Sequence, residues 1–555
     1  MLKIRFIWCL ALVFINQSIF AQGAKLNKVV VNKAAVEVQR PKMVIGIVVD
    51  QMRWDYLYRF YARYSEGGFK RLLREGFSAE NLLIPYTPTY TACGHASIYT
   101  GSVPAINGII SNNWFDPQQN KAVYCVDDYE VNTLGSNNKN GQRSPKNLLV
   151  TTLTDELRMA TNFRSKVISI AMKDRGAILP GGHTANGSFW YDGNSGNFIS
   201  STHYMKQLPD WVMAFNNQKL ADYYLAKDWH TLYPIASYTE STPDAQPYER
   251  LLKGEKSSSF PHVFSQFVGK DYYKLFSSPY GTSFTFDFAR AAINNEKLGQ
   301  NGNTDFLALS ISSTDYTGHE YGPNSIEVED TYLRLDKELE SFLIYLDKTY
   351  GKANYTLFLT ADHGATHVPQ FSIEHKMPAG VLATKDFKKG LDSLLLKDYA
   401  LTGALSSLVN NQLIFNKKII KAANVDYKAV KKSCIDYLLT QKGVLNAVDL
   451  EKLADATLPN EIKDKITKGY NAKRSGQVYF IFDSGWYPTL SGGTGHGAWN
   501  PYDSHIPALF MGWGIKPGKT NKSYSMTDIA PTIAALLHIQ EPSGNIGKVI
   551  TELIK

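Results

Sequence analysis

Six residues of two types that commonly bind metal ions follow apolar runs or lie in glycine-rich segments of this 555-residue chain. Aspartates end, or come soon after, three apolar runs, and histidines stand close to two of these aspartates and in the segment Gly492–Gly497. Carboxylate and imidazole ligands in this proportion suit Zn²⁺, and six of them suit two ions. The candidate ligands are Asp50, Asp315, His319, Asp362, His363 and His496.

A candidate nucleophile, Thr91, lies in the segment Pro85–Ser97, where turn residues follow a β-like run and a helix is predicted to begin. Unpaired backbone N–H groups and the positive end of the helix dipole meet at such a helix start. A hydroxyl there can receive an anionic phosphoryl group, although most threonines at helix starts only cap the helix. The distant aspartates and histidines favour the catalytic interpretation, because metal ions held by them would activate the hydroxyl.

The elements that must position these residues have the pattern of a buried parallel sheet. Residues 43–49, 305–312 and 355–361 are continuous apolar runs, typical of strands covered on both faces. Ligands in open α/β sheets lie beyond the carboxyl ends of the strands, so the aspartates are expected to meet there. A further strand is predicted over 166–170 and a last one over 508–513. The spacing also predicts helices over residues 54–74, 145–160, 325–350, 383–400, 427–441 and 526–537.

The alternation of strands and helices weakens twice along the chain, which predicts a catalytic core interrupted by two inserted regions. The length supports this, since 555 residues exceed a single core of about 250–300 residues. The predicted segments are a signal peptide (1–21), a linker (22–40), core (41–180), an inserted cap region (181–300), core (301–379), a second, Lys-rich inserted region (380–490) and core (491–555).

The N-terminus predicts export. Lys3 and Arg5 precede the apolar run Phe6–Phe14, and cleavage is expected after Ala21. That run is too short to cross a membrane, and no later segment offers the ~20 apolar residues that a spanning helix needs. We therefore expect an exported, periplasmic protein without a membrane anchor.

Charge and cysteine content narrow the function further. The formal net charge of +8 is spread along the chain, which mildly favours anionic substrates but does not predict nucleic-acid binding. Removal of the signal peptide would leave Cys93, Cys125 and Cys434, an odd number that allows at most one disulfide. Cys125 and Cys434 could pair, and the sequence leaves this open.

Together these motifs resemble the alkaline phosphatase superfamily, in its branch of nucleotide pyrophosphatase/phosphodiesterase-like enzymes. The resemblance implies an α/β, alkaline-phosphatase-like three-layer sandwich with a mostly parallel central sheet. The matching pieces are Val48-Val49-Asp50, Thr91-Ala92-Cys93-Gly94-His95, Gly108 to Asn112, Asp315-x-x-Gly-His319, Ala361-Asp362-His363-Gly364 and His496.

The resemblance also implies a role for each site residue, with two Zn²⁺ ions per chain. Thr91 would be the nucleophile and would also touch the second zinc, and Asn112 would donate to a phosphoryl oxygen. One zinc would take Asp315, His319 and His496, and the second would take Asp50, Asp362 and His363.

Lys173 and Arg175 resemble a pair found in a narrower subgroup, the Thr-nucleophile bacterial alkaline phosphatases of the PafA type. There the pair contacts the non-bridging oxygens of a phosphate monoester. A monoester dianion carries one more negative charge than a diester, and a lysine with a bidentate arginine can match it. The resemblance therefore implies hydrolysis of small phosphate monoesters through a covalent phosphothreonine. The alternative for Lys173 and Arg175 is a solvated charge cluster without a catalytic role.

Other functions stay open. A phosphodiesterase or nucleotide pyrophosphatase of the same fold is the main alternative, and a catalytically silent exported binding protein is a remote one. A sulfatase is disfavoured, because the segment around Thr91 lacks the Cys-x-Pro-x-Arg pattern that formylglycine formation needs. The oligomeric state is not determined by the sequence, and we favour a monomer.

Overall fold

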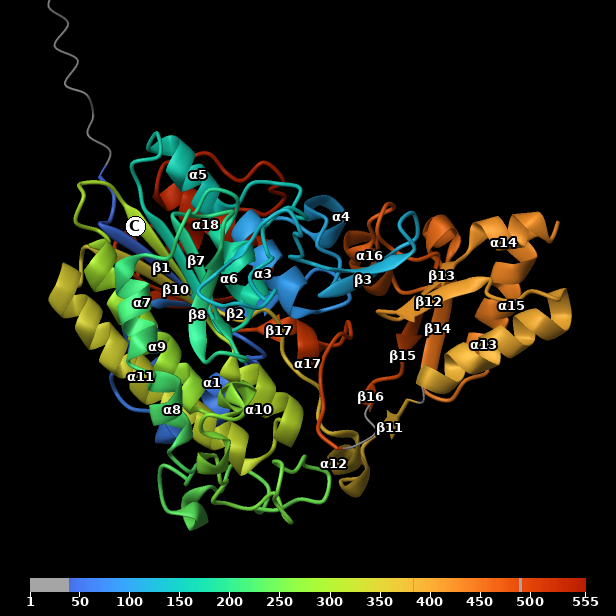
Figure 1. Cartoon of the computed structure of the whole chain (residues 1–555), viewed down its shortest axis with the longest axis horizontal. Coiled ribbons are helices and arrows are strands. Elements are labelled where there is room, and N and C mark those ends of the chain that lie inside the picture. The colour runs from blue at the N-terminus through green and yellow to red at the C-terminus, as the bar shows by residue number, and fades with distance from the viewer. Residues whose placement is uncertain (1–38, 383, 489–491) are drawn as a thin grey trace, which may run out of the picture. The chain divides into compact units, whose positions relative to one another are not determined.

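The predicted apolar strands lie side by side in the middle of a mixed sheet (Figure 1). The computed structural model describes residues 39–382, 384–488 and 492–555, so the predicted signal peptide and residues 22–38 of the predicted linker lie outside the described residues. The carboxyl ends of the four central strands share one edge of the sheet, as predicted, because these strands are parallel to one another. In spatial order they are β10 (Tyr355–Thr360), β1 (Met43–Val49), β9 (Asp305–Ile311) and β6 (Val167–Ala171).

Further strands extend the sheet on both sides, to eleven within the described residues. Beyond β10 they are mostly antiparallel to their neighbours, whereas beyond β6 the first is parallel and the next two are antiparallel. On the β10 side lie β18 (Ala508–Gly512), β2 (Phe77–Leu83), β17 (His505–Ile506) and β19 (Gly518–Ser525), and on the β6 side lie β7 (Gly187–Asp192), β8 (Asn197–Ser201) and β5 (Thr133–Leu134).

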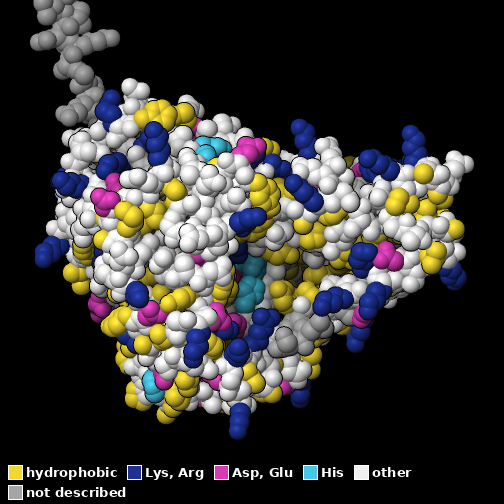
Figure 2. Space-filling model, viewed as in Figure 1, with side chains coloured by type: hydrophobic (Ala, Val, Ile, Leu, Met, Phe, Trp, Pro, Cys, Tyr) yellow, Lys and Arg dark blue, Asp and Glu magenta, His cyan; other side chains and the backbone are white. Residues whose placement is uncertain are grey.

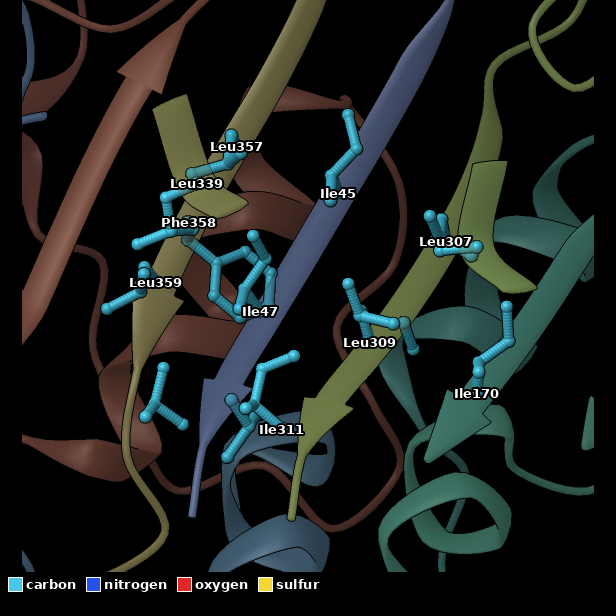
Figure 3. Packing of buried hydrophobic residues seen from close by; sticks show 14 of the residues in the cluster. Ile45, Ile47, Ile170, Leu307, Leu309, Ile311, Leu339, Leu357, Phe358 and Leu359 are labelled. Carbon is cyan, nitrogen blue, oxygen red and sulfur yellow. The ribbon is translucent and has the colours of Figure 1, made fainter. Parts of the chain in front are cut away.

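The register of the central strands stacks aliphatic side chains into rows across the sheet (Figure 3). Ile47 is aligned with Leu359 on β10 and with Leu309 on β9, and Leu309 is aligned with Ile170 on β6. All four side chains are buried, and burial of each such side chain contributes about 1.5–3 kcal/mol to folding. This packing holds the strand ends, and the residues that follow them, in a fixed relation.

Helices cover both faces of this sheet, which gives the predicted three-layer α/β sandwich (Figure 1). On one face lie α3 (Thr91–Thr100), α5 (Leu153–Ala160), α6 (Asp174–Gly181) and α18 (Ile529–Leu536). On the other lie α2 (Phe69–Glu75), α9 (Tyr280–Glu296), α10 (Ser313–Tyr321) and α11 (Ile326–Tyr350).

Two predicted helices are shorter than expected, one because of a tertiary contact and one because of a local helix cap. The helix predicted over 54–74 is divided into α1 (Tyr56–Arg59) and α2, because the Asp336 carboxylate accepts hydrogen bonds from the backbone N–H groups of Ser65 (2.6 Å) and Phe69 (2.7 Å). The helix predicted over 145–160 begins only at Leu153, where Thr152 caps it in a reciprocal capping box with Asp155.

The boundary that we predicted at residue 180 does not coincide with the end of the sheet. Strands β7 and β8, which follow it, extend the central sheet, and α9 near residue 300 packs against β6 and β9. Between them lie α7 (Asp210–Asn217), α8 (Leu220–Leu225) and a long stretch of turns and short 3₁₀ helices. Much of the region 181–300 is therefore joined to the core rather than set apart as a cap.

The second inserted region, 380–490, contains its own four-stranded sheet and its own hydrophobic core. Its strands pair in the order β12, β13, β15 and β14, and the short strands β11 (Gly380–Val381) and β16 (Trp486–Tyr487) pair where the chain enters and leaves. The elements are β12 (Leu405–Val409), β13 (Gln412–Phe415), β14 (Val444–Asp449), β15 (Val478–Phe482), α13 (Thr384–Tyr399), α14 (Lys417–Ala422), α15 (Tyr427–Leu439) and α16 (Asn460–Gly469).

Two findings concern the expectations on cysteines and membranes. Cys93, Cys125 and Cys434 are all buried free thiols, so Cys125 and Cys434 do not pair. No helix in the described ranges is long and apolar enough to cross a membrane.

Candidate active site

The three predicted aspartates converge where the central strands end. Asp50 directly follows β1, Asp362 comes two residues after β10, and Asp315 lies in the first turn of α10, which follows β9. All three are buried. Gln51 connects two of them, because its backbone N–H donates to Asp362 Oδ1 (3.1 Å) and its side-chain Nε2 donates to Asp315 Oδ1 (2.7 Å).

The three predicted histidines share one arrangement. In each, Nδ1 lies at hydrogen-bond distance from a backbone carbonyl oxygen: Thr494 O for His319 (2.7 Å), Gly364 O for His363 (3.0 Å) and Thr89 O for His496 (2.6 Å). Since a carbonyl oxygen only accepts, Nδ1 must carry the proton and Nε2 is left with its lone pair. This is the orientation of metal-binding histidines.

Each Nε2 atom faces the carboxylates. His363 Nε2 lies 3.5 Å from Asp50 Oδ1 and 3.4 Å from Asp362 Oδ2. His319 Nε2 and His496 Nε2 lie 3.2 and 3.7 Å from the same atom, Asp315 Oδ1. The structure therefore brings all six predicted ligands into one cluster.

Some donor atoms of the cluster have no protein partner, which favours a bound metal ion. Asp50 Oδ1 and Asp362 Oδ2 are buried without a hydrogen-bond partner among the described residues. Burial and the neighbouring Asp362 raise the pKa of Asp50 well above its ordinary value, although Lys173 opposes this. A divalent cation would satisfy both oxygens and relieve the repulsion.

Among the described residues, two sets of donors are compact enough to hold one ion each. Asp50, Asp362 and His363 form one set within 4.8 Å, which matches the predicted second site. The other compact set is Asp315, His363 and His496, in which His363 takes the place that we predicted for His319. The His363 and His496 rings stack with centroids 3.5 Å apart, which explains why His363 reaches both sets.

Thr91, the predicted nucleophile, lies at this cluster. It is the first residue of α3, it is buried, and its Oγ1 lies 3.3 Å from His363 Nε2. Gly94 makes the close approach of α3 possible, because a Cβ there would lie 2.4 Å from the backbone oxygen of Asp362. The helix start therefore directs its N–H groups and the threonine hydroxyl at the carboxylate–histidine cluster.

Asn112 lies beside the nucleophile. Its Oδ1 accepts a hydrogen bond from Ala92 N (2.9 Å), the N–H group that follows Thr91 in α3. Because an N–H group must meet an acceptor, this bond fixes the amide orientation and leaves Nδ2 as a donor next to Thr91. The placement is consistent with the predicted contact to a phosphoryl oxygen.

The two predicted cations occupy different places. Lys173, at the start of α6, is buried, and its Nζ donates to Asp50 Oδ2 (2.7 Å) and Asp315 Oδ2 (2.5 Å). Burial alone would lower the pKa of Lys173, but Asp315 and Asp50 outweigh it and raise the pKa. The structure thus excludes a solvated surface position for Lys173.

Arg175, the second residue of α6, donates to the Tyr124 hydroxyl (3.1 Å). Together with Lys173 and Tyr316 it lines a cavity of about 290 Å³. In the surface view, histidine side chains are visible at the bottom of a hollow with Lys or Arg side chains near its rim (Figure 2). Basic side chains around a buried cluster of carboxylate and imidazole groups favour an anionic substrate.

Three residues outside the predicted set support the site. Gln51 holds two aspartates in place, and its left-handed backbone (φ 65°) has no signal in the sequence beyond its position after Asp50. His95 connects α3 to the cluster, since its Nδ1 lies 2.9 Å from Thr91 O and 3.3 Å from Asp362 Oδ2. Asp503 supports the His496 loop by accepting from Gly497 N and Ala498 N.

Comparisons with known proteins agree with this arrangement. A model of the type I phosphodiesterase/nucleotide pyrophosphatase family matches residues 44–504. Alkaline phosphatase PhoV of Synechococcus elongatus is 68% identical over 518 residues, which cover 93% of this chain and 94% of PhoV. A Myroides odoratus protein named calcium-transporting ATPase is 51% identical over 527 residues, which cover 94% of this chain and 96% of that protein. The crystal structure of wild-type alkaline phosphatase PafA, 46% identical, matches with a TM-score of 0.90 over 93% of this chain and 100% of that chain, which confirms the predicted fold.

Proposed function

Because the chain belongs to the type I phosphodiesterase/nucleotide pyrophosphatase family, we propose that it is an exported di-zinc alkaline phosphatase that hydrolyses small phosphate monoesters through a covalent phosphothreonine. One observation carries the proposal: the hydroxyl of Thr91, the buried aspartates and histidines, and the Lys173 ammonium group meet at a single cluster. The names of PhoV and PafA, both alkaline phosphatases of high identity and coverage, support the same activity.

The residues that would hold two metal ions are the six predicted ligands. Asp50, Asp362 and His363, the ligands proposed for one ion, form a compact set. Asp315, His319 and His496 are the ligands proposed for the other ion, although the compact set around Asp315 contains His363 rather than His319. Zinc suits this mixture of carboxylate and imidazole. Two such ions would lower the pKa of an attacking hydroxyl and neutralise charge on the leaving oxygen.

The reaction makes specific demands on Thr91. Its oxygen forms a bond to phosphorus while the bond between phosphorus and the ester oxygen breaks, and the alcohol leaves with a proton. A water molecule then attacks the phosphothreonine, and inorganic phosphate leaves as Thr91 regains its hydroxyl. The Asn112 amide nitrogen, held in place by the bond from Ala92 N to Asn112 Oδ1, donates to a phosphoryl oxygen during both steps, and the positive end of the α3 dipole favours the anionic group.

Lys173 and Arg175 would select the monoester. The transition state of phosphoryl transfer is loose, so the protein contributes mainly position and charge. A monoester presents an additional anionic oxygen, and two neighbouring cations stabilise it in a way that a diester cannot use.

The first test is turnover by Thr91→Ala. We expect the purified protein to hydrolyse p-nitrophenyl phosphate and to lose at least about 10³-fold in kcat/KM when the hydroxyl is removed. Thr100→Ala, the same change at the opposite end of α3, is the matched control and should stay near wild-type activity. Acid-quenched enzyme should carry phosphate on Thr91, and elemental analysis should give about two zinc ions per chain. Full activity of Thr91→Ala would overturn the nucleophile assignment.

The second test concerns substrate class. We expect Lys173→Ala combined with Arg175→Ala to reduce kcat/KM for p-nitrophenyl phosphate by about 10²-fold or more, because both cations meet the additional charge of the monoester. Hydrolysis of bis-p-nitrophenyl phosphate should change little. Equal losses on both esters would contradict the assignment and favour the phosphodiesterase alternative, for which the family description is the supporting observation.

Two further parts of the proposal need separate measurements. Mass spectrometry of the mature protein from cell fractions tests cleavage after Ala21 and a periplasmic location. Light scattering after size exclusion tests the monomer. ATP belongs in the substrate panel, since its terminal phosphoryl group presents the same dianionic end as a monoester and a relative carries the name of an ATPase.

A further inference from the structure

A hairpin of the second inserted region contacts the segment that carries Asn112. The turn between β12 and β13 consists of Asn410 and Asn411, both in the left-handed conformation (φ 54° and 60°), which is the backbone of a two-residue hairpin turn. This turn lies against the start of β3 (Asn113–Asp116), almost 300 residues earlier in the chain (Figure 1).

The Asn410 amide joins the residues on both sides of Asn112. Its Oδ1 accepts a hydrogen bond from Ser111 Oγ (2.9 Å), and its Nδ2 donates to the backbone oxygen of Asn113 (2.7 Å). Ser111 is buried, and its bond to Asn410 is partly buried, whereas the bond to Asn113 is exposed. One side chain therefore holds the Ser111 hydroxyl before the candidate phosphate donor and the Asn113 backbone after it.

Arg474, also from the second inserted region, contacts the two ends of the same segment. Its guanidinium donates to the backbone oxygens of Gly108 and Asn147 (2.8 Å for the latter) and lies 4.9 Å from the centre of the Trp114 ring. The segment 108–114 is thus held at both ends and around its middle by residues of region 380–490. Within the segment, Asn112 accepts a hydrogen bond from α3, at Ala92 N.

We propose that Asn410 is a positioning residue for phosphoryl binding, which holds Ser111 and Asn113 so that the Asn112 amide stays directed at the group attacked by Thr91. This inference rests on the proposed function and assigns a catalytic purpose to the second inserted region. Because Asn112 would contact a phosphoryl oxygen that monoesters and diesters share, loss of Asn410 should weaken both reactions alike, unlike loss of Lys173 and Arg175.

The decisive variant is Asn410→Gly, because glycine accepts the left-handed backbone while the side chain with its amide is removed. We expect kcat/KM to fall about tenfold on both p-nitrophenyl phosphate and bis-p-nitrophenyl phosphate, the size typical of residues that orient a contacting group. Asn424→Gly is the matched control, since Asn424 is exposed and also left-handed (φ 55°), and it should match wild-type activity. Ser111→Ala, which removes one of the two hydrogen bonds of Asn410, should also reduce kcat/KM on both esters.

A double-mutant cycle separates positioning from general destabilisation. In an Asn112→Ala background, Asn410→Gly should change kcat/KM less than about twofold, because the positioned group is gone. An undiminished tenfold loss in that background, or equal activities of Asn410→Gly and Asn424→Gly, would overturn the inference. Calorimetric binding of inorganic phosphate tests the same cycle without turnover. If the wild-type protein hydrolyses neither ester, the proposed function fails, whereas the phosphate-binding cycle still decides the role of Asn410.

Discussion

The carboxylate–histidine cluster has two halves that the fold holds in different ways. The sheet-held half, Asp50, Asp362 and His363, lies within three residues of the ends of the adjacent parallel strands β1 and β10, and all three residues are fully buried. The loop-held half comes from α10 and from the segment 492–497, and the His319 side chain is 28% exposed. The loop-held half consists of Asp315, His319 and His496.

This difference teaches where the site is rigid. Moving a sheet-held ligand would require a change in the strand register that packs Ile47 against Leu309 and Leu359. In the loop-held half, Asp315 and His319 lie on α10, whereas the segment that carries His496 is held by backbone contacts such as Gly493 N to Tyr248 O (2.7 Å). Segments with few buried contacts open more readily, so we expect the loop-held half to release its metal ion first.

Ligand substitutions should separate the halves most strongly. We expect Asp362→Asn to reduce monoesterase kcat/KM by about 10³-fold or more, because it removes charge from the set beside Thr91. His319→Asn should cost about 10²-fold, since an asparagine amide can still donate to Thr494 O and only the Nε2 ligand is lost.

Metal content is the second readout of this comparison. His319→Asn should retain about one zinc ion per chain, whereas Asp362→Asn should disturb both ions because His363 faces both donor sets. Slow chelation of the wild-type enzyme should remove one ion before the other. Equal effects of the two substitutions, with a single chelation phase, would mean that the two halves are equally rigid.

Much of the fold could be predicted from local sequence signals. Runs such as Met43–Val49 are apolar at every position, so they had to be strands buried on both faces, and the position of Asp50 at a strand end followed from that. By contrast, β7 (Gly187–Asp192) has no such run, and its place in the sheet depends on pairing with β6 and β8. Helices were overextended where tertiary contacts end them, as the Asp336 carboxylate does before Phe69.

The chemically reactive residues of the candidate site could also be predicted from the sequence. Asp, His and Thr residues carry their chemistry in their side chains, and their positions at strand and helix ends gave their approximate locations. The supporting contacts were not predictable, because Gln51 and Asn410 are ordinary polar residues whose roles depend on which distant segment they meet. One compact donor set contains His363 where the sequence predicted His319. This difference depends on side-chain geometry, which the spacing of ligands in the sequence does not determine.

A single glycine offers a test confined to the loop-held half. Gly493 has φ 70°, and a Cβ there would lie 2.1 Å from the backbone oxygen of His319. We expect Gly493→Ala to displace the loop, weaken retention of one zinc ion and reduce kcat/KM about tenfold. Gly302→Ala is the matched control, because Gly302 is also left-handed (φ 78°) but has no atom within 4 Å of the added Cβ. Unchanged zinc retention in Gly493→Ala would show that this backbone does not control the loop-held ligands.

The smallest expected effect is a pH dependence that reaches the loop-held half through a buried histidine. His262 lies within hydrogen-bond distance of Glu255 Oε1 (2.9 Å) and Glu327 Oε1 (3.2 Å), and the nearby residues Tyr248 and Arg250 contact Gly493 and Glu320. Burial alone would lower the pKa of His262, but the bonds to Glu255 and Glu327 raise it to about 9. Burial and Glu327 also raise the pKa of Glu249 in this segment, to about 8.

The sign follows from proton binding in the folded state. His262 binds its proton more tightly when folded than its ordinary pKa of about 6.5 allows, so its contribution is complete below pH 6.5 and is lost as the pH rises through about 9. The shift corresponds to at most about 3 kcal/mol. Glu249 adds a loss in the same direction at lower pH, so His262→Gln is needed to isolate the histidine. Hydrogen exchange, corrected for its intrinsic pH dependence, should increase between pH 6.5 and 9.5 in segments 244–262 and 492–497, while β1 and β10 stay protected. In His262→Gln this increase should be smaller, because the remaining pH dependence comes from Glu249. An equal increase in the variant, or one that includes β1, would remove the link between this histidine and the loop-held half.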